Sequence, residues 1–261
     1  ATADDVFTIA VSADGEYIVA GTEDNAASGT VYLFDKDSGT PIWSYETGDD
    51  VYSVAISADG EYIVAGSTDH KVYLFDKDSS TPLWSYTTGS NEVFVAISAD
   101  GEFVAVASDK VYLFDKDSST PLWSYSTGNT LESLAISADG KYVTAGSGGS
   151  SDKVYLFEKD SSTPLWTYSA GGAVFGLAIS ADGEYIVAGT WNDDKVILFD
   201  KDSNDPLWSY TTGSSVATVS ISADGEYITA GSYDEKVYLF DKDSNDPLWS
   251  YATGQLVYSV S

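Results

Sequence analysis

Short apolar runs separated by polar turns recur along the whole chain. In one representative stretch the gaps between these runs hold Gly, Asp, Ser and Pro, and Asp59-Gly60 is a hairpin-turn signal. The runs themselves are rich in Val, Ile, Tyr, Phe and Trp, which favour β-strands. The pattern therefore predicts four short strands, at Val51–Ile56, Tyr62–Ala65, Val72–Phe75 and Leu83–Tyr86.

The same pattern occurs six times. Ser-Ala-Asp-Gly is followed each time by a version of Val-Tyr-Leu-Phe-Asp-Lys-Asp-Ser and then by Pro-Leu/Ile-Trp. The tetrapeptide begins at residues 12, 57, 98, 137, 180 and 222, so the steps are 45, 41, 39, 43 and 42 residues. A repeat of this length with four strands is typical of a β-propeller blade.

The fold class is therefore predicted to be all-β, a six-bladed β-propeller with four antiparallel strands per blade and a spare C-terminal strand. One domain is expected over residues 1–261. The tryptophan that closes each repeat is expected to fill the space between neighbouring blades. The repeat units are placed at about 5–48, 49–89, 90–128, 129–171, 172–213 and 214–254, with the extra strand at 255–261.

Two families share these motifs. The stretch SVAISADGEYIVAGS resembles the first two strands of a WD-repeat blade, and KVYLFDKDSSTPLWSYTTG resembles the PQQ-like repeat. Both resemblances imply a propeller, a fold that hosts many unrelated functions. The chain lacks the Gly-His and Trp-Asp dipeptides of WD repeats. It also lacks the vicinal cysteines and the arginine of quinone-dependent dehydrogenases, so no quinone site is expected.

The last residues raise a question of closure. Residues 255–261, QLVYSVS, match the start of the first strand at Val51–Ala55, so the chain carries seven first strands for six blades. We expect a closed ring with adjacent termini. The alternatives are a tail strand that adds to a second molecule, giving strand-mediated self-association in place of a monomer, and a chain cut from a longer array.

The turns divide into a constant and a variable set. The turns between the first and second strands and between the third and fourth strands are nearly invariant among the six repeats, whereas the remaining loops vary from Ser108–Lys110 to Gly21–Thr30. Variable loops on a rigid scaffold usually carry binding residues, although drift after duplication is the alternative. The predicted ligand-binding residues are His70, Glu132, Trp191, Asp193, Asp194, Tyr233 and Asp234.

Two features single out particular residues among these candidates. Trp191 and Tyr233 are aromatic residues in the loops of adjacent repeats, which fits a protein or glycan partner. Glu132 opens a first strand, and its counterparts by sequence position are Tyr52, Val93 and Phe175.

Charge excludes several partners. The chain has 12 Lys, no Arg and 41 acidic residues, for a net charge of −29, which argues against nucleic acid and against anionic membrane surfaces. It has no apolar run long enough to span a bilayer, so no membrane insertion is expected. The constant turns hold 25 of the acids and seven of the lysines. This acidity favours binding of divalent cations or of a cationic protein partner, or else serves only solubility and turn formation.

Candidate chemistry is limited. There is no Cys and a single His, which disfavours zinc sites and Ser-His-Asp triads. The only metal hypothesis is calcium, because two turns begin like a calcium-binding loop, although their sixth and twelfth positions depart from it. No cofactor is expected otherwise. The candidate metal ligands are Asp200, Asp202, Asn204, Asp241, Asp243 and Asn245.

The interpretation is a non-enzymatic binding or interaction scaffold whose ligand face is formed by the variable loops. One alternative is a self-assembling surface protein that uses the spare strand, and another is a glycan-binding or glycan-hydrolysing propeller. The narrow amino-acid alphabet indicates recent amplification or consensus design. An extracellular or cell-surface setting is expected.

Overall fold

The structure is a computed structural model that describes residues 5–23, 28–149 and 152–260. Within these residues the regular elements are 24 β-strands in six four-stranded antiparallel sheets, without a helix. The chain comprises two compact units, residues 1–126 and 127–261, with three sheets each. Parts of the variable loops Gly21–Thr30 and Gly148–Asp152, and the end of the spare strand at Ser261, lie outside the described residues.

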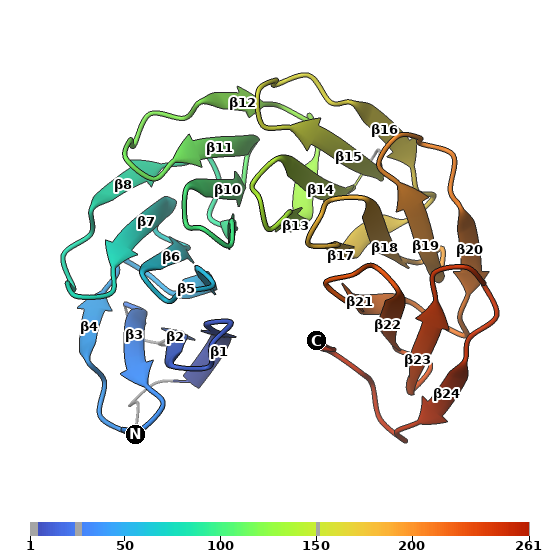
Figure 1. Ribbon diagram of the computed structural model, residues 1–261, viewed down its shortest axis with the longest axis horizontal. Coiled ribbons are helices and arrows are strands. Elements are labelled where there is room, and N and C mark those ends of the chain that lie inside the picture. The colour runs from blue at the N-terminus through green and yellow to red at the C-terminus, as the bar shows by residue number, and fades with distance from the viewer. Residues whose placement is uncertain (1–4, 24–27, 150–151, 261) are drawn as a thin grey trace. The chain divides into compact units, whose positions relative to one another are not determined.

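The first unit contains three blades whose strands pair in chain order (Figure 1). Blade 1 is β1–β4, blade 2 is β5–β8 and blade 3 is β9–β12. Their bounds are β1 Asp5–Val11, β2 Tyr17–Glu23, β3 Thr30–Asp35, β4 Trp43–Glu46, β5 Val51–Ile56, β6 Tyr62–Ser67, β7 Lys71–Asp76, β8 Trp84–Thr87, β9 Phe94–Ile97, β10 Phe103–Ala107, β11 Val111–Asp115 and β12 Trp123–Tyr125.

The second unit repeats this arrangement with blade 4 (β13–β16), blade 5 (β17–β20) and blade 6 (β21–β24). Their bounds are β13 Thr130–Ile136, β14 Tyr142–Gly148, β15 Lys153–Glu158, β16 Trp166–Ser169, β17 Ala173–Ile179, β18 Tyr185–Trp191, β19 Lys195–Asp200, β20 Trp208–Thr211, β21 Val216–Ile221, β22 Tyr227–Ser232, β23 Lys236–Asp241 and β24 Trp249–Ala252.

The predicted fold class is confirmed: six four-stranded antiparallel blades in sequence make an all-β, six-bladed propeller with a spare C-terminal segment. The four strands predicted for the second repeat match β5 to β8 to within two residues at each end. Each blade meanders, so the turns between strands one and two and between strands three and four lie at one end of the sheet. The two remaining sets of loops lie at the other end.

The first turn of each blade is held by its own side chains. In blade 5, the hydroxyl of Ser180 donates to Asp182 Oδ1 at 2.6 Å and accepts the N–H of Tyr185 at 3.0 Å. The carboxylate of Asp182 also accepts the N–H of Glu184 at 3.0 Å. Gly183 completes the turn with a φ of 76°, which favours glycine. These bonds explain why Ser-Ala-Asp-Gly recurs without change.

The hydrophobic core lies between blades. Val19, Val31 and Leu33 of blade 1 form one buried cluster with residues of blade 2, and corresponding clusters join blades 2 and 3, 4 and 5, and 5 and 6. Because both faces of an inner blade are covered, its second and third strands are apolar at nearly every position. Each blade therefore depends on its neighbours for most of its apolar burial.

Four polar and aromatic contacts recur at these interfaces. The indole Nε1–H of four closing tryptophans donates to the backbone carbonyl of a lysine in the next blade at 2.7 Å, in the pairs Trp43–Lys77, Trp84–Lys116, Trp166–Lys201 and Trp208–Lys242. The tryptophan ring also packs against a buried phenylalanine of that blade, as in Trp208 and Phe240 at 5.3 Å. The prediction that these tryptophans fill the space between blades is confirmed for the four pairs.

The other two contacts involve the Ser-Ala-Asp-Gly turns. The N–H of Ala181 donates to the carbonyl of Ala223 in the next blade at 3.1 Å, and equivalent bonds join Ala13 to Ala58, Ala58 to Ala99 and Ala138 to Ala181. The tyrosine that begins β18, Tyr185, lies directly over Gly225 of the next blade, where a Cβ would come within 2.5 Å of the ring. The glycine therefore serves both the turn and the close approach of the neighbouring ring.

Replacing the tryptophan of one internal interface tests the indole bond. Trp208→Phe keeps a large ring but leaves the carbonyl of Lys242 without its donor, so we expect the free energy of unfolding to fall by about 1–2 kcal/mol. Trp249→Phe is the matched control, because Trp249 makes no such bond among the described residues. Urea unfolding monitored by circular dichroism measures both, and equal effects of the two substitutions would contradict this role.

Because of the turn aspartates, we expect the free energy of unfolding to fall at acidic pH. The Ser180 hydroxyl, followed by the N–H of Glu184, holds the pKa of Asp182 below its ordinary value, and serine bonds do the same for Asp14 and Asp224. A depressed folded-state pKa stabilises the fold above the unfolded-state pKa. This stabilisation disappears as the pH falls below about 4 and through the folded-state pKa.

Urea midpoints at pH 7 and pH 3 test this expectation. Wild-type protein should lose more stability over that interval than Asp182→Asn, whose amide does not titrate. Asp205→Asn, in an exposed turn of the same blade, should behave like wild type. An Asp182→Asn variant with the full wild-type loss of stability would show that this carboxylate does not contribute.

Candidate functional site

The first strand of most blades carries a β-bulge near its start. The pairing register shifts around one extra residue in β1, β5, β13, β17 and β21. In β9 the pairing runs without a shift. Side chains of a regular strand alternate between the two faces of the sheet, and the extra residue of a bulge interrupts this alternation. Bulges are common next to functional sites. The bulged residues are Phe7, Tyr52, Glu132, Phe175 and Ala217.

In the second unit this geometry assembles a row of aromatic rings, which we call the aromatic row: Phe175, Trp191, Tyr233 and Tyr258. Successive ring centroids are 5.2, 4.8 and 5.4 Å apart. Phe175 is 41% exposed and Tyr258 is 68% exposed. Four rings from β17, the end of β18, the loop after β22 and the C-terminal segment thus form one continuous solvent-accessible surface.

The structure brings together two of the residues predicted from sequence, Trp191 and Tyr233. Burial, with Tyr258 beside it, raises the pKa of the Tyr233 hydroxyl. The two ends of the row, Phe175 and Tyr258, were not among the predicted residues. The signal was present, because Phe175 and Tyr258 follow a valine at the start of a first strand, as Phe7 and Tyr52 do. The first unit has a similar series, in which the ring of Tyr52 lies 5.7 Å from Phe7 and 5.1 Å from Phe94.

The register of β9 corrects one comparison made from sequence. Glu132 occupies the bulge of β13, and Val93 was taken as its counterpart in blade 3. Because β9 has no bulge, Val93 instead packs over Gly66, as Val51 packs over Gly21 in the blade before. Phe94 pairs with Ala107 as Ser133 pairs with Gly146, so blade 3 has no residue that corresponds to the bulged Glu132. Glu132 itself lies over Gly148, where a Cβ would be 2.9 Å from its carboxylate.

Asp234 is held in a contact between blades. Its carboxylate accepts the N–H of Gly213 at the end of blade 5 at 2.9 Å, the N–H of Lys236 at 3.1 Å, and the hydroxyl of Tyr238. Asp69 and Asp109 make the same bonds to the preceding glycine and to a tyrosine of their own blade. We call this arrangement the aspartate clasp. Burial, followed by the bond to Asp234, raises the pKa of Tyr238.

The remaining predicted ligand residues lie in turns of the same end. His70 is exposed with a φ of 69°, and its carbonyl accepts bonds from both the N–H and the hydroxyl of Thr88. Asp193 pairs with Lys195 at 2.8 Å. Asp194 has a φ of 57°, and its carbonyl and carboxylate bond to Thr212 and Ser215. His70 belongs to the first unit, whereas the other predicted residues belong to the second. Their contact with a ligand stays a prediction.

The predicted calcium ligands lie in the turns at the opposite end of blades 5 and 6. Asp200 accepts the N–H of Asp202 at 2.8 Å, and Asp202 pairs with Lys201 at 2.9 Å. The amide of Asn204 points to the preceding blade, where it donates to the carbonyl of Thr167 at 3.1 Å. Asp241, Asp243 and Asn245 repeat this pattern, with the Asn245 amide donating to Ser209 at 3.3 Å.

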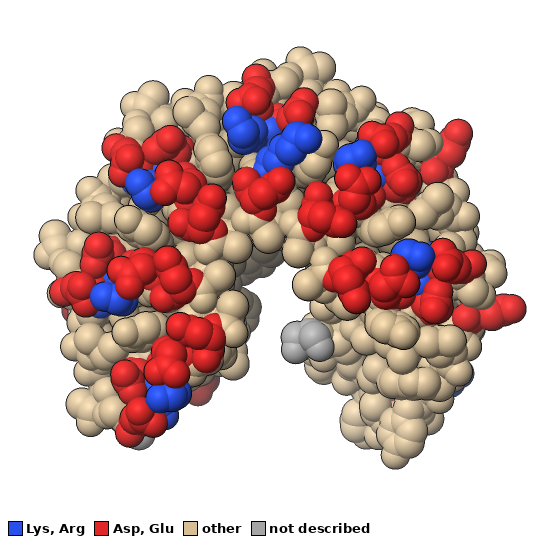
Figure 2. Space-filling model, in the orientation of Figure 1, with Lys and Arg blue, Asp and Glu red and all other residues tan. Residues whose placement is uncertain are grey.

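These side chains therefore already satisfy local bonds. Within the part of the chain that the structure describes, no three His, Cys, Asp or Glu residues are grouped to hold a metal ion. Figure 2 shows the acidic residues of this end gathered around lysines on each blade. The lysines pair with glutamates across the turns, as in Lys77–Glu61 at 3.4 Å and Lys201–Glu184 at 3.2 Å.

Comparison with known families agrees with this architecture. The family model described as outer membrane protein assembly factor BamB matches residues 27–150 and 107–256. The chain belongs to this family. The WD domain, G-beta repeat, also matches residues 1–35, within blade 1. The resemblance to PQQ-like and WD-repeat blades is thus confirmed. No curated protein matches the chain significantly. No helix among the described residues is long and apolar enough to cross a membrane.

The aspartate clasp predicts that Asp234 stabilises the fold in the absence of any ligand. Asp234→Ala removes the acceptor of two backbone N–H groups and of a largely buried tyrosine hydroxyl, so we expect a loss of about 2–4 kcal/mol in unfolding free energy. Asp193→Ala is the control from the neighbouring blade, where the loss of one exposed ion pair should change stability by less than about 1 kcal/mol. Thermal and urea unfolding would show the difference, and an unchanged Asp234→Ala would contradict the clasp.

Proposed function

We propose that the protein is a non-enzymatic interaction scaffold that needs no cofactor and binds a protein segment through the loops at the bulged end of its blades. The observation that carries this proposal is the aromatic row. Aromatic side chains dominate the binding energy of many protein interfaces. Phe175, Trp191 and Tyr233 stand on a bulge, a strand end and a turn of the blades, so binding a partner there does not require the scaffold to reorganise.

The orientation of the rings favours a protein segment over a sugar. Successive rings in the row are inclined by 48°, 76° and 72°. They form notches between ring edges and faces, which suit aliphatic and cationic side chains, rather than one flat platform for a sugar ring. The same end of these blades is acidic, because its six carboxylates outnumber its three lysines. The carboxylates belong to Glu132, Asp152, Asp193, Asp194, Asp234 and Glu235, and the lysines are Lys153, Lys195 and Lys236. A segment with apolar and basic residues would complement this surface.

The described residues also support a role without catalysis. The single histidine is exposed in a turn, and several of the acidic residues at this end are engaged in the clasp or in ion pairs. The family description names an assembly factor of the outer membrane. We propose by analogy that this chain also acts in an extracellular or cell-surface setting.

A random peptide library displayed on phage tests the proposed function. Selection on the immobilised chain should enrich peptides that combine Lys or Arg with apolar residues. A synthetic peptide of the enriched sequence should bind the Phe175→Ser, Tyr233→Ser double variant at least about tenfold more weakly. Leu165→Ser, a change of an exposed residue on the outer edge of the same unit, is the matched control.

Two outcomes would contradict the proposal. One is a selection that enriches the same sequences on wild type and on the double variant. The other is binding to a glycan array that the double variant abolishes, which would assign the aromatic row to a sugar.

A further inference from the structure

The turn that carries Trp191 differs from its counterparts in blades 2 and 6. It is one residue longer than either of them. Two of its residues, Asn192 and Asp194, have left-handed backbone angles, with φ of 69° and 57°. The shorter turns, both fully described, have one such residue each, at His70 and Glu235. Left-handed angles are uncommon outside glycine, so a turn with two of them depends on the bonds around it.

The hydroxyl of Ser215 provides these bonds. Ser215 lies directly before β21, in the loop that enters blade 6, and is only 8% exposed. Its hydroxyl accepts the N–H of Asn192 at 3.1 Å and donates to Asp194 Oδ1 at 3.3 Å. One side-chain group of blade 6 therefore binds both left-handed residues of the turn in blade 5.

The backbone of the same serine holds the loop of Tyr233. The N–H of Tyr233 donates to the carbonyl of Ser215 at 2.9 Å, as the N–H of Thr68 donates to the carbonyl of Asp50 in blade 2. The backbone bond is thus part of the repeat, whereas the residue at the equivalent position of blade 2 has a carboxylate in place of the hydroxyl. Ser215 therefore joins the two segments that carry neighbouring rings of the aromatic row.

The backbone of Trp191 itself is fixed within blade 5. Trp191 pairs with Ala173 in the ladder between β17 and β18. Gly172, in the loop before β17, lies so close that a Cβ there would come within 2.0 Å of the carbonyl oxygen of Trp191. Blade 5 thus fixes the strand end that carries the ring, and Ser215 of blade 6 fixes the turn that follows it.

These contacts bear directly on the arrangement of the two rings. The centroids of Trp191 and Tyr233 are 4.8 Å apart, and the ring planes are inclined by 76°. Two rings on separate blades keep such an edge-to-face contact only if both backbones are held in place. A surface that is ordered before binding loses less conformational entropy when the partner arrives, and so binds more tightly.

We propose that Ser215 is a positioning residue of the aromatic row. Its hydroxyl fixes the turn after Trp191, so that the pair of Trp191 and Tyr233 has its binding geometry before a partner arrives. The expected gain in affinity for an apolar and basic segment rests on the proposed function, whereas the effect on the ring does not. Ser215 acts through Trp191 and makes no contact with the partner.

Fluorine NMR of protein labelled with 5-fluorotryptophan tests the effect on the ring. The chain has seven tryptophans, and the signal that disappears in Trp191→Phe belongs to Trp191. Ser215→Ala should shift and broaden this signal, because the turn loses both hydroxyl bonds. Asp194→Ala, which removes one of the two, should affect the same signal. Ser215→Thr keeps a hydroxyl and should preserve it.

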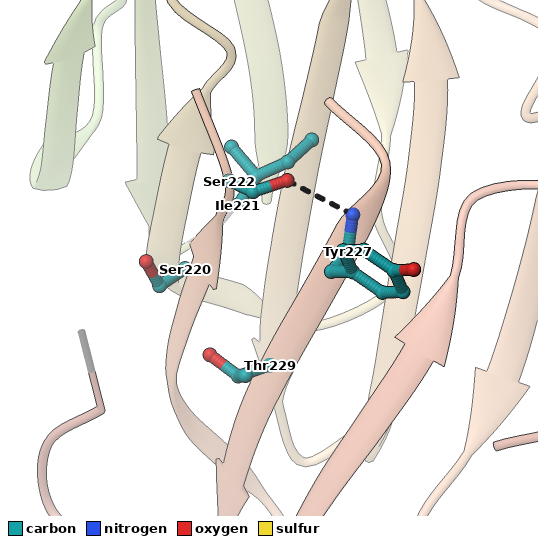
Figure 3. Close-up of a pocket in the computed structure, with 5 residues that line it drawn as sticks. All are labelled: Ser220, Ile221, Ser222, Tyr227 and Thr229. Atoms are coloured by element: carbon teal, nitrogen blue, oxygen red, sulfur yellow. Dashed lines mark hydrogen bonds between the residues drawn. The ribbon is translucent and has the colours of Figure 1, made fainter. Parts of the chain in front are cut away.

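Two further serine variants are the controls. Ser67→Ala, in blade 2, removes a hydroxyl that donates to the carbonyl of Asp49 at 3.0 Å and accepts the N–H of Asp69 at 3.2 Å. Ser220→Ala removes a hydroxyl from β21. Among the described residues neither hydroxyl bonds the turn of Trp191, so neither variant should move its signal. Ser220 lines a cavity of about 190 Å³ together with Ile221, Ser222, Tyr227 and Thr229 (Figure 3).

The effect on binding is measured with the synthetic peptide that selection on the immobilised chain yields. Ser215→Ala should weaken its binding at least about fivefold, and Ser215→Thr should restore it. In a Trp191→Ser background the same Ser215→Ala change should have less than about a twofold further effect, because it acts through the absent ring. A general structural defect would instead weaken binding to the same extent in both backgrounds.

The two measurements separate this inference from the proposed function. A Trp191 signal that is unchanged in Ser215→Ala would overturn the inference, whatever the chain binds. Equal losses of affinity in the two backgrounds would also overturn it. A selection that yields no peptide dependent on the aromatic row would contradict the proposed function, while a shifted Trp191 signal in Ser215→Ala would still establish that Ser215 positions the ring.

Discussion

The burial of each blade against the next is the interaction on which this protein depends. A single four-stranded sheet of this sequence has two apolar faces and cannot cover either by itself. The largest buried side chains, among them Phe75, Phe199 and Phe240, lie at the interfaces between blades rather than within one sheet. Stability is therefore a property of neighbouring pairs, and a blade without a neighbour exposes the residues that elsewhere form the core.

Polar groups determine how the blades meet. Apolar contact alone would allow two flat sheets to slide, because hydrophobic attraction has no preferred direction. The indole bond at the outer strand and the alanine bond between the turns join blades 1 and 2, 2 and 3, 4 and 5, and 5 and 6. The aspartate clasp at the opposite end adds a third point of connection between blades 1 and 2, 2 and 3, and 5 and 6. Hydrogen bonds need specific distances and angles, so together they specify one relative position. Much of the repeated polar sequence is explained by this requirement rather than by chemistry.

The candidate binding surface arises where the repeat departs from regularity. A bulge adds one residue to the first strand and re-aims its side chain, and the aromatic row results where this residue meets the rings of the adjacent loops and of the C-terminal segment. Ala217 at the bulge of β21 shows that the bulge itself does not require an aromatic residue. The fold therefore does not require rings at these positions, whereas it uses the clasp aspartates to join blades.

The sequence by itself determined the six repeats, their four strands and the role of the closing tryptophan, because alternation and turn residues are local signals that need no knowledge of neighbours. It also singled out Trp191 and Tyr233, since an aromatic residue in a variable loop stands out by comparison with the other repeats; the structure places their rings together, and their contact with a ligand stays a prediction. Phe175 and Tyr258 were missed, and Glu132 was compared with Val93, because a bulge changes which side chains correspond without changing the pattern of residue types. Asp234 was predicted to bind a ligand, and its structural bonds to Gly213 and Tyr238 were not foreseen, because they join separate segments of the chain. Only the tertiary structure decides such contacts, because they depend on how one sheet packs against the next.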